Sequence, residues 1–193
     1  IILFDIHENS DEVFTENDIS NIGAFQNLIN SFYEMNQLAI NNNNLKDDIV
    51  LSLIRTLELY DQYTGGHSED VATLSRLLAE KMNLSKSEIY DIYWAGIVHD
   101  IGKIGIKSEI INKASRLTLE EYKQVQQHSM YGYEVLNRSS ELATIAKLVK
   151  HHHEWYNGSG YPDKLKDKEI PLGSQILQVA DSVSSMATRR SYQ

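Results

Sequence analysis

The chain has 193 residues, 41% of them hydrophobic and 23% charged, which is typical of a globular protein with one or two domains. Its formal net charge of −9 argues against a nucleic-acid polymer as partner, because such a partner selects a basic surface. The chain has no cysteine, which excludes disulfides, zinc–thiolate sites and thiol nucleophiles. The sequence shows no signal peptide and no apolar stretch of the ~18 residues that a membrane span needs, so we expect a cytoplasmic location.

Residues 1–44 are predicted to be the end of one domain and a linker to the next. The stretch 1–6 (IILFDI) is rich in β-branched and aromatic residues, which predicts a short strand. Thr15 can then cap a helix. Apolar residues recur along that helix every three or four positions, at Ile19, Ile22, Phe25, Ile29 and Phe32. This strand followed by a helix resembles the C-terminal end of a GAF sensor domain.

The apolar stripe of the predicted helix at 18–40 has two interpretations. It could form the contact of a homodimer, or it could pack against the remainder of its own domain. The sequence favours neither interpretation over the other.

Residues 45–193 are predicted to form one all-α domain, entered through a connecting helix. Two helix starts show a serine or threonine followed three residues later by glutamate, Ser85 with Glu88 and Thr118 with Glu121. Further starts are expected at Ser140, which precedes Glu141, and after Pro171. Loops are expected at 61–66, 102–117 and 153–172.

Histidines are concentrated in this domain to a degree that needs an explanation. Six of the seven lie between residues 67 and 153: His67, His99, His128, His151, His152 and His153. Asp100 follows a very apolar helix, and Asp181 interrupts an apolar run, so each carboxylate needs a partner or a metal if it is buried. Imidazoles and carboxylates without thiolates suit iron, manganese, zinc, cobalt or nickel.

Each of these residues also has an ordinary explanation when it is taken alone. His128 could be a partly exposed polar residue of its helix, and the triplet 151–153 could be a polar helix end. His99 and Asp100 could simply end a helix beside Gly102. All of these explanations would have to hold together, which makes a shared metal site the better hypothesis.

Two longer motifs carry a family resemblance. The first is HDIGK at 99–103, and the second is HHEWYNGSGYP at 152–162, with Asn157 where aspartate is usual. Together with DQYTGGHS at 61–68 and the stretch from Ala180-Asp181 to Tyr192, they resemble the HD-GYP subfamily of the HD metal-dependent phosphohydrolases. The resemblance spans roughly residues 50–193 and implies an all-α HD-type fold. Members of the subfamily usually continue further, so we expect this domain to be truncated at its C-terminus.

The resemblance implies a set of metal ligands and two divalent transition metals. Asp100 would bridge the two ions, for which iron or manganese is expected first and zinc, cobalt or nickel next. Tyr63 replaces a glutamate that helps to hold a third ion in some members, and His151 lies outside the motif, so neither is expected to be a ligand. The implied ligands are His67, His99, Asp100, His128, His152, His153 and Asp181.

The resemblance further implies hydrolysis of cyclic di-GMP, a bacterial second messenger, to linear pGpG or to GMP by a water that two metals activate. Asp100 and Lys103 are the expected catalytic residues, with Lys103 neutralising phosphate charge. The expected substrate contacts are Lys103, Gly160, Tyr161, Pro162 and Arg190. Proteins with a GGDEF domain are an implied partner class.

Two alternatives to this activity stay open at the level of the sequence. One is a catalytically idle module that binds a cyclic dinucleotide for signalling. The other is an HD phosphohydrolase that acts on a different substrate, such as a hybrid cyclic dinucleotide. The sequence does not separate the two cyclic dinucleotides, and it does not identify the native metal or the final product.

Overall fold

The computed structural model describes residues 26–27, 29–35, 37, 47–56, 58 and 66–187. Contacts between Cα atoms divide the chain into two units, Ile1–Ile49 and Val50–Gln193. The described residues between 26 and 37 are helical, and their side chains are exposed. The strand predicted at 1–6 and the cap predicted at Thr15 lie outside the described residues. Within the described part of the chain, no helix is long and apolar enough to cross a membrane.

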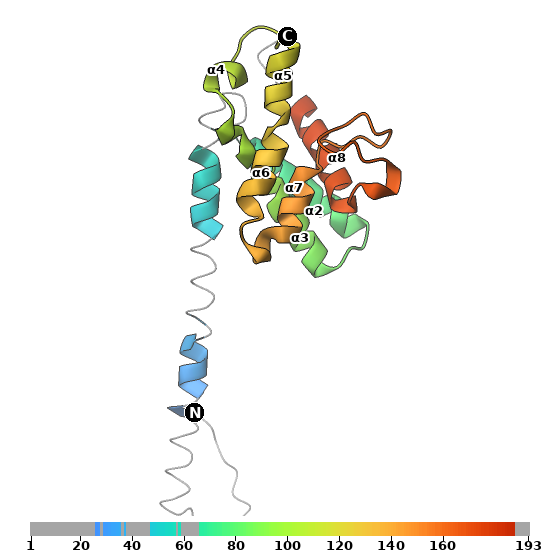
Figure 1. Cartoon of the computed structure of the whole chain (residues 1–193). Helices are drawn as coiled ribbons and strands as arrows, with labels where there is room; N and C mark the ends of the chain where they lie inside the picture. The colour runs from blue at the N-terminus through green and yellow to red at the C-terminus, as the bar shows by residue number, and fades with distance from the viewer. Residues whose placement is uncertain are drawn as a thin grey trace, which may run out of the picture. The chain divides into compact units, whose positions relative to one another are not determined.

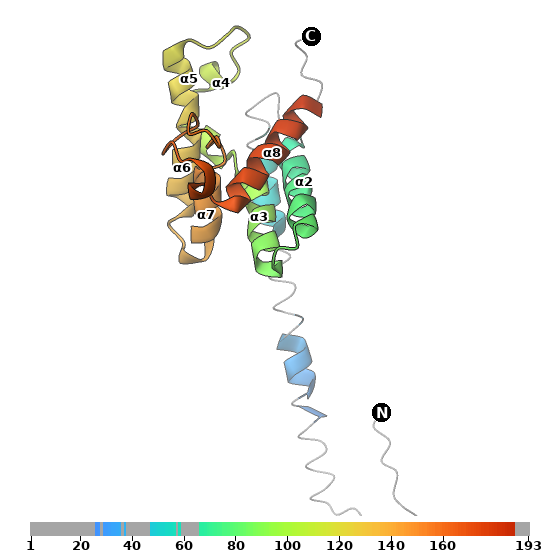
Figure 2. The same cartoon turned by 90° about the vertical axis from the view of Figure 1, so that its right-hand side faces the viewer.

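The second unit is all-α over its described residues, as predicted, and Figures 1 and 2 show its helices from two directions. The α-helices are α2 (His67–Lys81), α3 (Lys86–Val98), α4 (Ser108–Ile111), α5 (Leu119–Gln126), α6 (His128–Leu136), α7 (Ala143–Lys150) and α8 (Leu172–Ala187). Short 3₁₀ helices form at η1 (Ile101–Gly105), η2 (Ser140–Leu142) and η3 (Asp167–Glu169).

One hydrophobic core is shared by α2, α3, α6, α7 and α8. Helix α2 packs against α3 and α8, helix α6 packs against α7 and η1, and α3 contacts both α7 and α8. Val71 on α2, Ile97 on α3, Val149 on α7 and Leu177 on α8 are almost completely buried in the shared core. Burial of such side chains stabilises the fold by about 1.5–3 kcal/mol each, so the core fixes how the helix ends lie relative to one another.

Local sequence signals explain several of the helix starts. Ser85 and Thr118 both accept a hydrogen bond from the backbone N–H three residues later, and Glu88 and Glu121 bond back to the cap residues, as predicted. Helix α8 begins directly after Pro171, also as predicted. At Ser140 the structure differs, because η2 begins there without any side-chain cap.

In two further places the structure differs from the predicted elements. The loop predicted at 102–117 contains η1 and α4, which are too short to show a helical period in the sequence. The helix predicted to run through His128 is divided at Gln127 into α5 and α6. The Gln127 N–H bonds to the carbonyl of Gln124, three residues back, which is a 3₁₀ turn at the junction.

Gly96 is the contact point of α3 with α2, and this predicts the effect of adding one methyl group. A Cβ at position 96 would lie 2.6 Å from the Cα of Ala72. Gly96→Ala should therefore lower the free energy of unfolding by about 1–3 kcal/mol, although alanine has the higher helix propensity. Urea denaturation followed by circular dichroism measures this change.

Ser87→Ala is the matched control, since Ser87 is exposed on the same helix. It should change the free energy of unfolding by less than about 0.5 kcal/mol. A Gly96→Ala variant as stable as the wild type would show that α2 and α3 are not packed this closely.

Candidate metal centre

The seven residues predicted as ligands lie together where the helices of the second unit meet. His67 begins α2, His99 and Asp100 follow α3, and His128 begins α6. His152 and His153 follow the end of α7, and Asp181 lies within α8. The hydrophobic core therefore places residues from five separate segments at one point.

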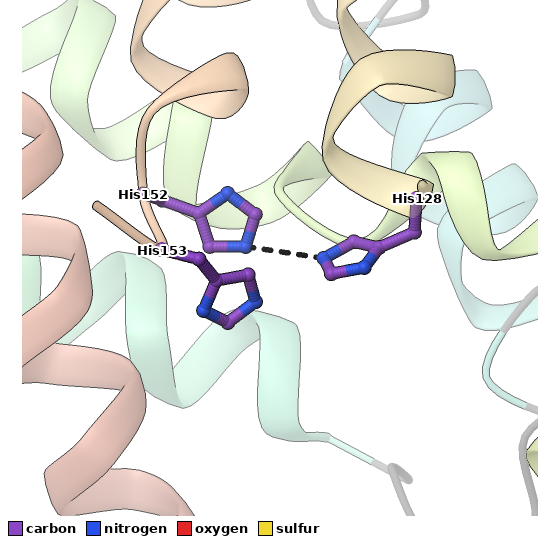
Figure 3. Close-up of side chains that lie close together, drawn as sticks. All are labelled: His128, His152 and His153. Carbon is purple, nitrogen blue, oxygen red and sulfur yellow. Dashed lines mark hydrogen bonds between the residues drawn. The ribbon is translucent and has the colours of Figure 1, made fainter. Parts of the chain in front are cut away.

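His128, His152 and His153 form the first group of possible ligands (Figure 3). The Nε2 atoms of His128 and His152 are 3.4 Å apart, and Figure 3 shows them pointing at each other from two different elements. The rings of His152 and His153 lie next to each other with centroids 4.0 Å apart. One nitrogen from each of the three residues lies within 4.8 Å of the other two.

His67, His99 and Asp100 form the second group, and Asp181 lies against it. His67 Nε2 is 3.1 Å from Asp181 Oδ1, and His99 Nε2 is 3.3 Å from Asp100 Oδ2. The other oxygen of Asp100, Oδ1, is 3.5 Å from Nε2 of His128 in the first group. Asp100 therefore lies between the two groups and can contact both.

Backbone carbonyls hold three of the histidines in one orientation. The Nδ1–H groups of His99, His128 and His152 donate to the carbonyls of Gly96, Val125 and Val149, each three residues back. A carbonyl oxygen can only accept, so these bonds place a proton on Nδ1, and in the neutral rings of His128 and His152 the lone pair is then on Nε2. Metal-ligating histidines are typically held in this way.

This arrangement fits a cation. With both protons on Nδ1, the facing Nε2 atoms of His128 and His152 have no N–H between them, and two lone pairs repel unless a positive ion separates them. Two nitrogens bonded at ~2.1 Å to one tetrahedral ion lie about 3.4 Å apart, which is their distance here. The donor set therefore suits a divalent transition metal.

Burial keeps the first group of histidines neutral. It lowers the pKa of His128, and it holds the pKa of His152 well below the usual range, with neighbouring histidines adding to the effect. Burial, with the neighbouring His128 adding to the effect, lowers the pKa of His153 to about 3. Neutral imidazoles are the form that binds metals, so no proton has to leave these rings first.

The second group is ionic. Burial opposes the charge on His99, but the carboxylates of Asp100 and Asp181 outweigh it and raise the pKa of His99 to about 9. Burial likewise opposes the charge on Asp100, but Lys103 and His99 hold its pKa well below the usual range. Asp181 stays ionised, because the hydrogen bond from His67 and the charge of His99 outweigh burial and lower its pKa to about 2.

Lys103 lies beside the bridging carboxylate. Its Nζ is 2.8 Å from Asp100 Oδ2, and its side chain is only 19% exposed. The ammonium group is thus held at the edge of the candidate metal centre rather than extended into solvent. This placement suits the predicted role toward a phosphate.

His151 lies apart from both groups of possible ligands. It is buried, its Nδ1 is 3.8 Å from Glu154 Oε1, and its Nε2 is 3.9 Å from Asp163 Oδ2. Asp163 also forms an ion pair with Lys150 at 2.6 Å. The first histidine of the triplet therefore lies beside the acidic residues of the following loop and not among the candidate ligands.

Glu154 organises that loop, a role that the sequence did not indicate. Its side chain is completely buried and accepts hydrogen bonds from the backbone N–H groups of Asp163, at 2.6 Å, and Leu165, at 3.1 Å. The motif itself contains this glutamate, but only the folded loop shows which backbone groups it bonds. The carboxylate holds the end of the loop against its beginning.

The three substrate contacts predicted in this loop lie next to the histidines. A Cβ on Gly160 would lie 2.5 Å from the carbonyl oxygen of His153, so only glycine allows this close approach. Tyr161 stacks on His153 with ring centroids 4.8 Å apart and donates its N–H to the carbonyl of His153 at 3.2 Å. Pro162 follows it and is half-buried. Tyr63 and Arg190 lie outside the described residues.

The positions of His151 and His152 predict opposite effects on metal content. His152→Ala should lower the amount of bound transition metal, because it removes a donor that faces His128. His151→Ala is the matched control and should leave metal content unchanged. Elemental analysis of both purified variants checks this, and a loss of metal in the His151 variant would mean that the triplet is assigned one residue out of register.

The chain matches known proteins over this same region. A family described as "HD domain" matches residues 52–193. A cyclic di-GMP phosphodiesterase of Thermotoga maritima is 42% identical over 146 residues, which cover 74% of this chain and 40% of that protein. A 3′3′-cGAMP-specific phosphodiesterase 2 of Vibrio cholerae is 36% identical over 147 residues, which cover 75% of this chain and 28% of that protein. The chain thus spans less than half the length of these relatives.

Two solved structures share the fold. A cyclic GMP-AMP specific phosphodiesterase of Vibrio cholerae, V-cGAP3, matches with a TM-score of 0.56 and 20% identity over 72% of this chain and 40% of that one. An HDG"Y"P protein of Bdellovibrio bacteriovorus matches with a TM-score of 0.52 and 19% identity over 63% of this chain and 40% of that one. At this identity the likeness concerns the fold alone. From the match over residues 52–193, the chain belongs to the HD domain family.

Proposed function

We propose that this chain is an HD-GYP phosphodiesterase that hydrolyses cyclic di-GMP with two divalent transition metals. The observation that carries the proposal is the position of Asp100 between two groups of buried donors, with one oxygen near each group. The ligands proposed for the two metals are His67, His99, Asp100, His128, His152, His153 and Asp181. Iron or manganese suits this imidazole and carboxylate set, and zinc, cobalt and nickel are the next candidates.

The metals bring two kinds of chemistry to such a site when they are bound. They lower the pKa of a coordinated water, and they neutralise charge on a phosphate. The protein's contribution is to hold the donors rigidly at the ends of packed helices and to exclude most solvent from them. His99, His128 and His152 are almost completely buried, so their orientation is fixed before any substrate arrives.

Lys103 is proposed to act on the phosphate directly. A phosphodiester gains negative charge on its oxygens as attack proceeds, and a preorganised ammonium group stabilises that charge. In the structure Nζ bonds to Asp100 Oδ2. A metal on Asp100 would share that oxygen's charge, and the ammonium could then turn to a phosphate oxygen close by.

The loop after His153 is proposed to contact the rest of the dinucleotide. Tyr161 presents an aromatic ring beside the histidines, and Gly160 and Pro162 shape the backbone around it. Arg190, outside the described residues, is proposed as an anchor for a phosphate or a guanine. The names of the relatives support a cyclic dinucleotide as substrate, since they act on cyclic di-GMP or on 3′3′-cGAMP.

Three further proposals concern the context of the domain. Residues 1–44 are proposed to be the end of a GAF-like sensor domain and a linker, and residues 45–193 to be the HD-GYP domain. The helix before the linker is proposed to form a homodimer, and GGDEF-domain proteins are proposed as partners. A second messenger acts inside the cell, so the proposed location is the cytoplasm.

Asp100→Ala tests the activity and the metal assignment together. Wild-type protein loaded with Mn²⁺ should bind two ions per chain and convert cyclic di-GMP to linear pGpG or GMP, which chromatography resolves. The variant should lose hydrolysis entirely and bind fewer ions, because a bridging carboxylate contributes to both positions. Elemental analysis and the product assay measure the two effects on the same sample.

Asp70→Ala is the control for this variant, because Asp70 is an exposed carboxylate on α2. It should retain both ions and full activity. Hydrolysis of 3′3′-cGAMP in place of cyclic di-GMP by the wild type would favour the second substrate, and hydrolysis of neither would overturn the proposal.

Lys103→Ala should separate metal binding from turnover. A protonated lysine has no lone pair for a cation, so metal content should not change. Turnover should fall by roughly 10²–10³-fold, the cost of losing one group that stabilises transition-state charge. Steady-state kinetics beside metal analysis decides the role: normal turnover would exclude a catalytic part for Lys103, and lost metal would show that it organises the ligands instead.

Lys107→Ala controls for the removal of a nearby positive charge. Lys107 lies just after η1 and is exposed. Its loss should leave turnover within about twofold of the wild type.

A further inference from the structure

His67 is held differently from His99, His128 and His152. Its Nδ1 is 2.9 Å from the hydroxyl oxygen of Ser184, whereas the other three histidines donate from Nδ1 to backbone carbonyls. Both residues of this contact are buried, Ser184 to 3% exposure, although they are 117 positions apart in the chain. At Nδ1, the orientation of His67 therefore depends on a side chain of α8 and not on a backbone carbonyl.

The hydroxyl differs chemically from a carbonyl in a way that matters for binding a metal. A hydroxyl both donates and accepts, so Ser184 can bond to His67 with the proton on either ring nitrogen. With the proton on Nε2, His67 donates to Asp181 Oδ1, 3.1 Å away, and Nδ1 accepts from Ser184. With the proton on Nδ1, His67 donates to Ser184 and Nε2 has a lone pair for a cation.

Helix α8 thus supplies both partners of His67 from consecutive turns. Asp181 and Ser184 are three residues apart, so they lie on the same face of the helix. Ser185 adds a hydrogen bond of 3.2 Å from its hydroxyl to Asp181 Oδ1. The ring of His67 is therefore held by side chains of one helix, whereas the rings of His99, His128 and His152 are held by backbone carbonyls.

We propose that Ser184 is a positioning residue that keeps the ring of His67 oriented toward the metal centre and allows, without enforcing it, the tautomer that can bind a metal. It follows that the cation held by His67 and Asp181 binds more weakly, and exchanges more readily, than the cation held by the His128 group. This inference rests on the two-metal site proposed above. It assigns a role to Ser184, which is not a proposed ligand, and it predicts different affinities at the two metal positions.

Binding of Mn²⁺ to metal-free protein tests the inference without any use of enzymatic activity. The wild type should titrate with two unequal affinities in isothermal calorimetry, and elemental analysis after limited chelation should leave one ion. Ser184→Ala should weaken the lower-affinity step by about 10–100-fold, the usual cost of losing a group that orients a metal ligand. The higher-affinity step should stay unchanged.

Two further variants separate hydrogen bonding from packing. Ser184→Thr keeps the hydroxyl and should retain the lower-affinity binding step. If position 184 only required a small side chain, alanine would instead be tolerated better than threonine. Ser182→Ala is the matched control, because Ser182 is exposed on the same helix and bonds only to the Gln178 carbonyl among the contacts described. It should bind both ions as the wild type does. If Ser184→Ala does not fold by circular dichroism, Ser184→Cys, close in size but a weak hydrogen-bonding partner, replaces it.

The outcomes distinguish this inference from the proposed function. A wild-type protein that binds fewer than two ions would overturn the two-metal proposal itself. The role of Ser184 alone would be overturned if the wild type binds two ions and Ser184→Ala binds them as the wild type does. The same holds if Ser184→Ala weakens both binding steps equally. Loss of the weaker step in Ser184→Thr as well would show that packing, not the hydroxyl, is what matters.

Discussion

Burial of Asp100 beside His99, His128 and Lys103 is the interaction on which the site depends. A buried carboxylate costs free energy unless positive charge or hydrogen-bond donors surround it, and here Lys103 and His99 lie within 3.3 Å of one of its oxygens. Removing one partner of such a group strongly destabilises the fold, because the remaining charge stays buried without compensation. A buried, ionised carboxylate with an oxygen toward each group of donors is therefore a natural place for a divalent cation.

Close packing behind the carboxylate keeps this arrangement fixed. Gly102 lies two residues after Asp100, and a Cβ there would overlap the carbonyl oxygen of His128 and lie 2.5 Å from the Gly132 nitrogen. The 3₁₀ helix η1 can therefore rest directly on the start of α6. This contact joins the segment that carries Asp100 and Lys103 to the segment that carries His128, so the two donor groups cannot move apart independently.

The sequence was sufficient to predict what depends on local patterns and on residue type. The all-α class and the caps at Ser85 and Thr118 follow from short-range signals, and the structure confirms them. The candidate donors could be named because histidine and aspartate stand out in apolar helices. The family resemblance, rather than the periodicity, indicated which of them would converge.

Features that depend on distant contacts could not be predicted. Glu154 binds backbone groups 9 and 11 residues away, and Ser184 contacts His67 across 117 positions, so no local pattern predicts these contacts. The break at Gln127 is similar, because α5 and α6 each look like part of one continuous helix in the sequence. In each case the fold, and not residue type, decides the role.

Electrostatic interactions at two length scales explain how a chain with a negative net charge can bind an anionic substrate. The formal net charge of −9 repels a dinucleotide with two phosphates, but free charges are screened beyond about 8 Å at physiological ionic strength. Groups within the candidate metal centre are screened much less, since burial keeps water and salt away from them. Two divalent cations would add a charge of +4 where Asp100 and Asp181 supply −2, and the ammonium of Lys103 adds one more. A substrate close to the site would thus meet a local positive charge that the surface acids do not cancel.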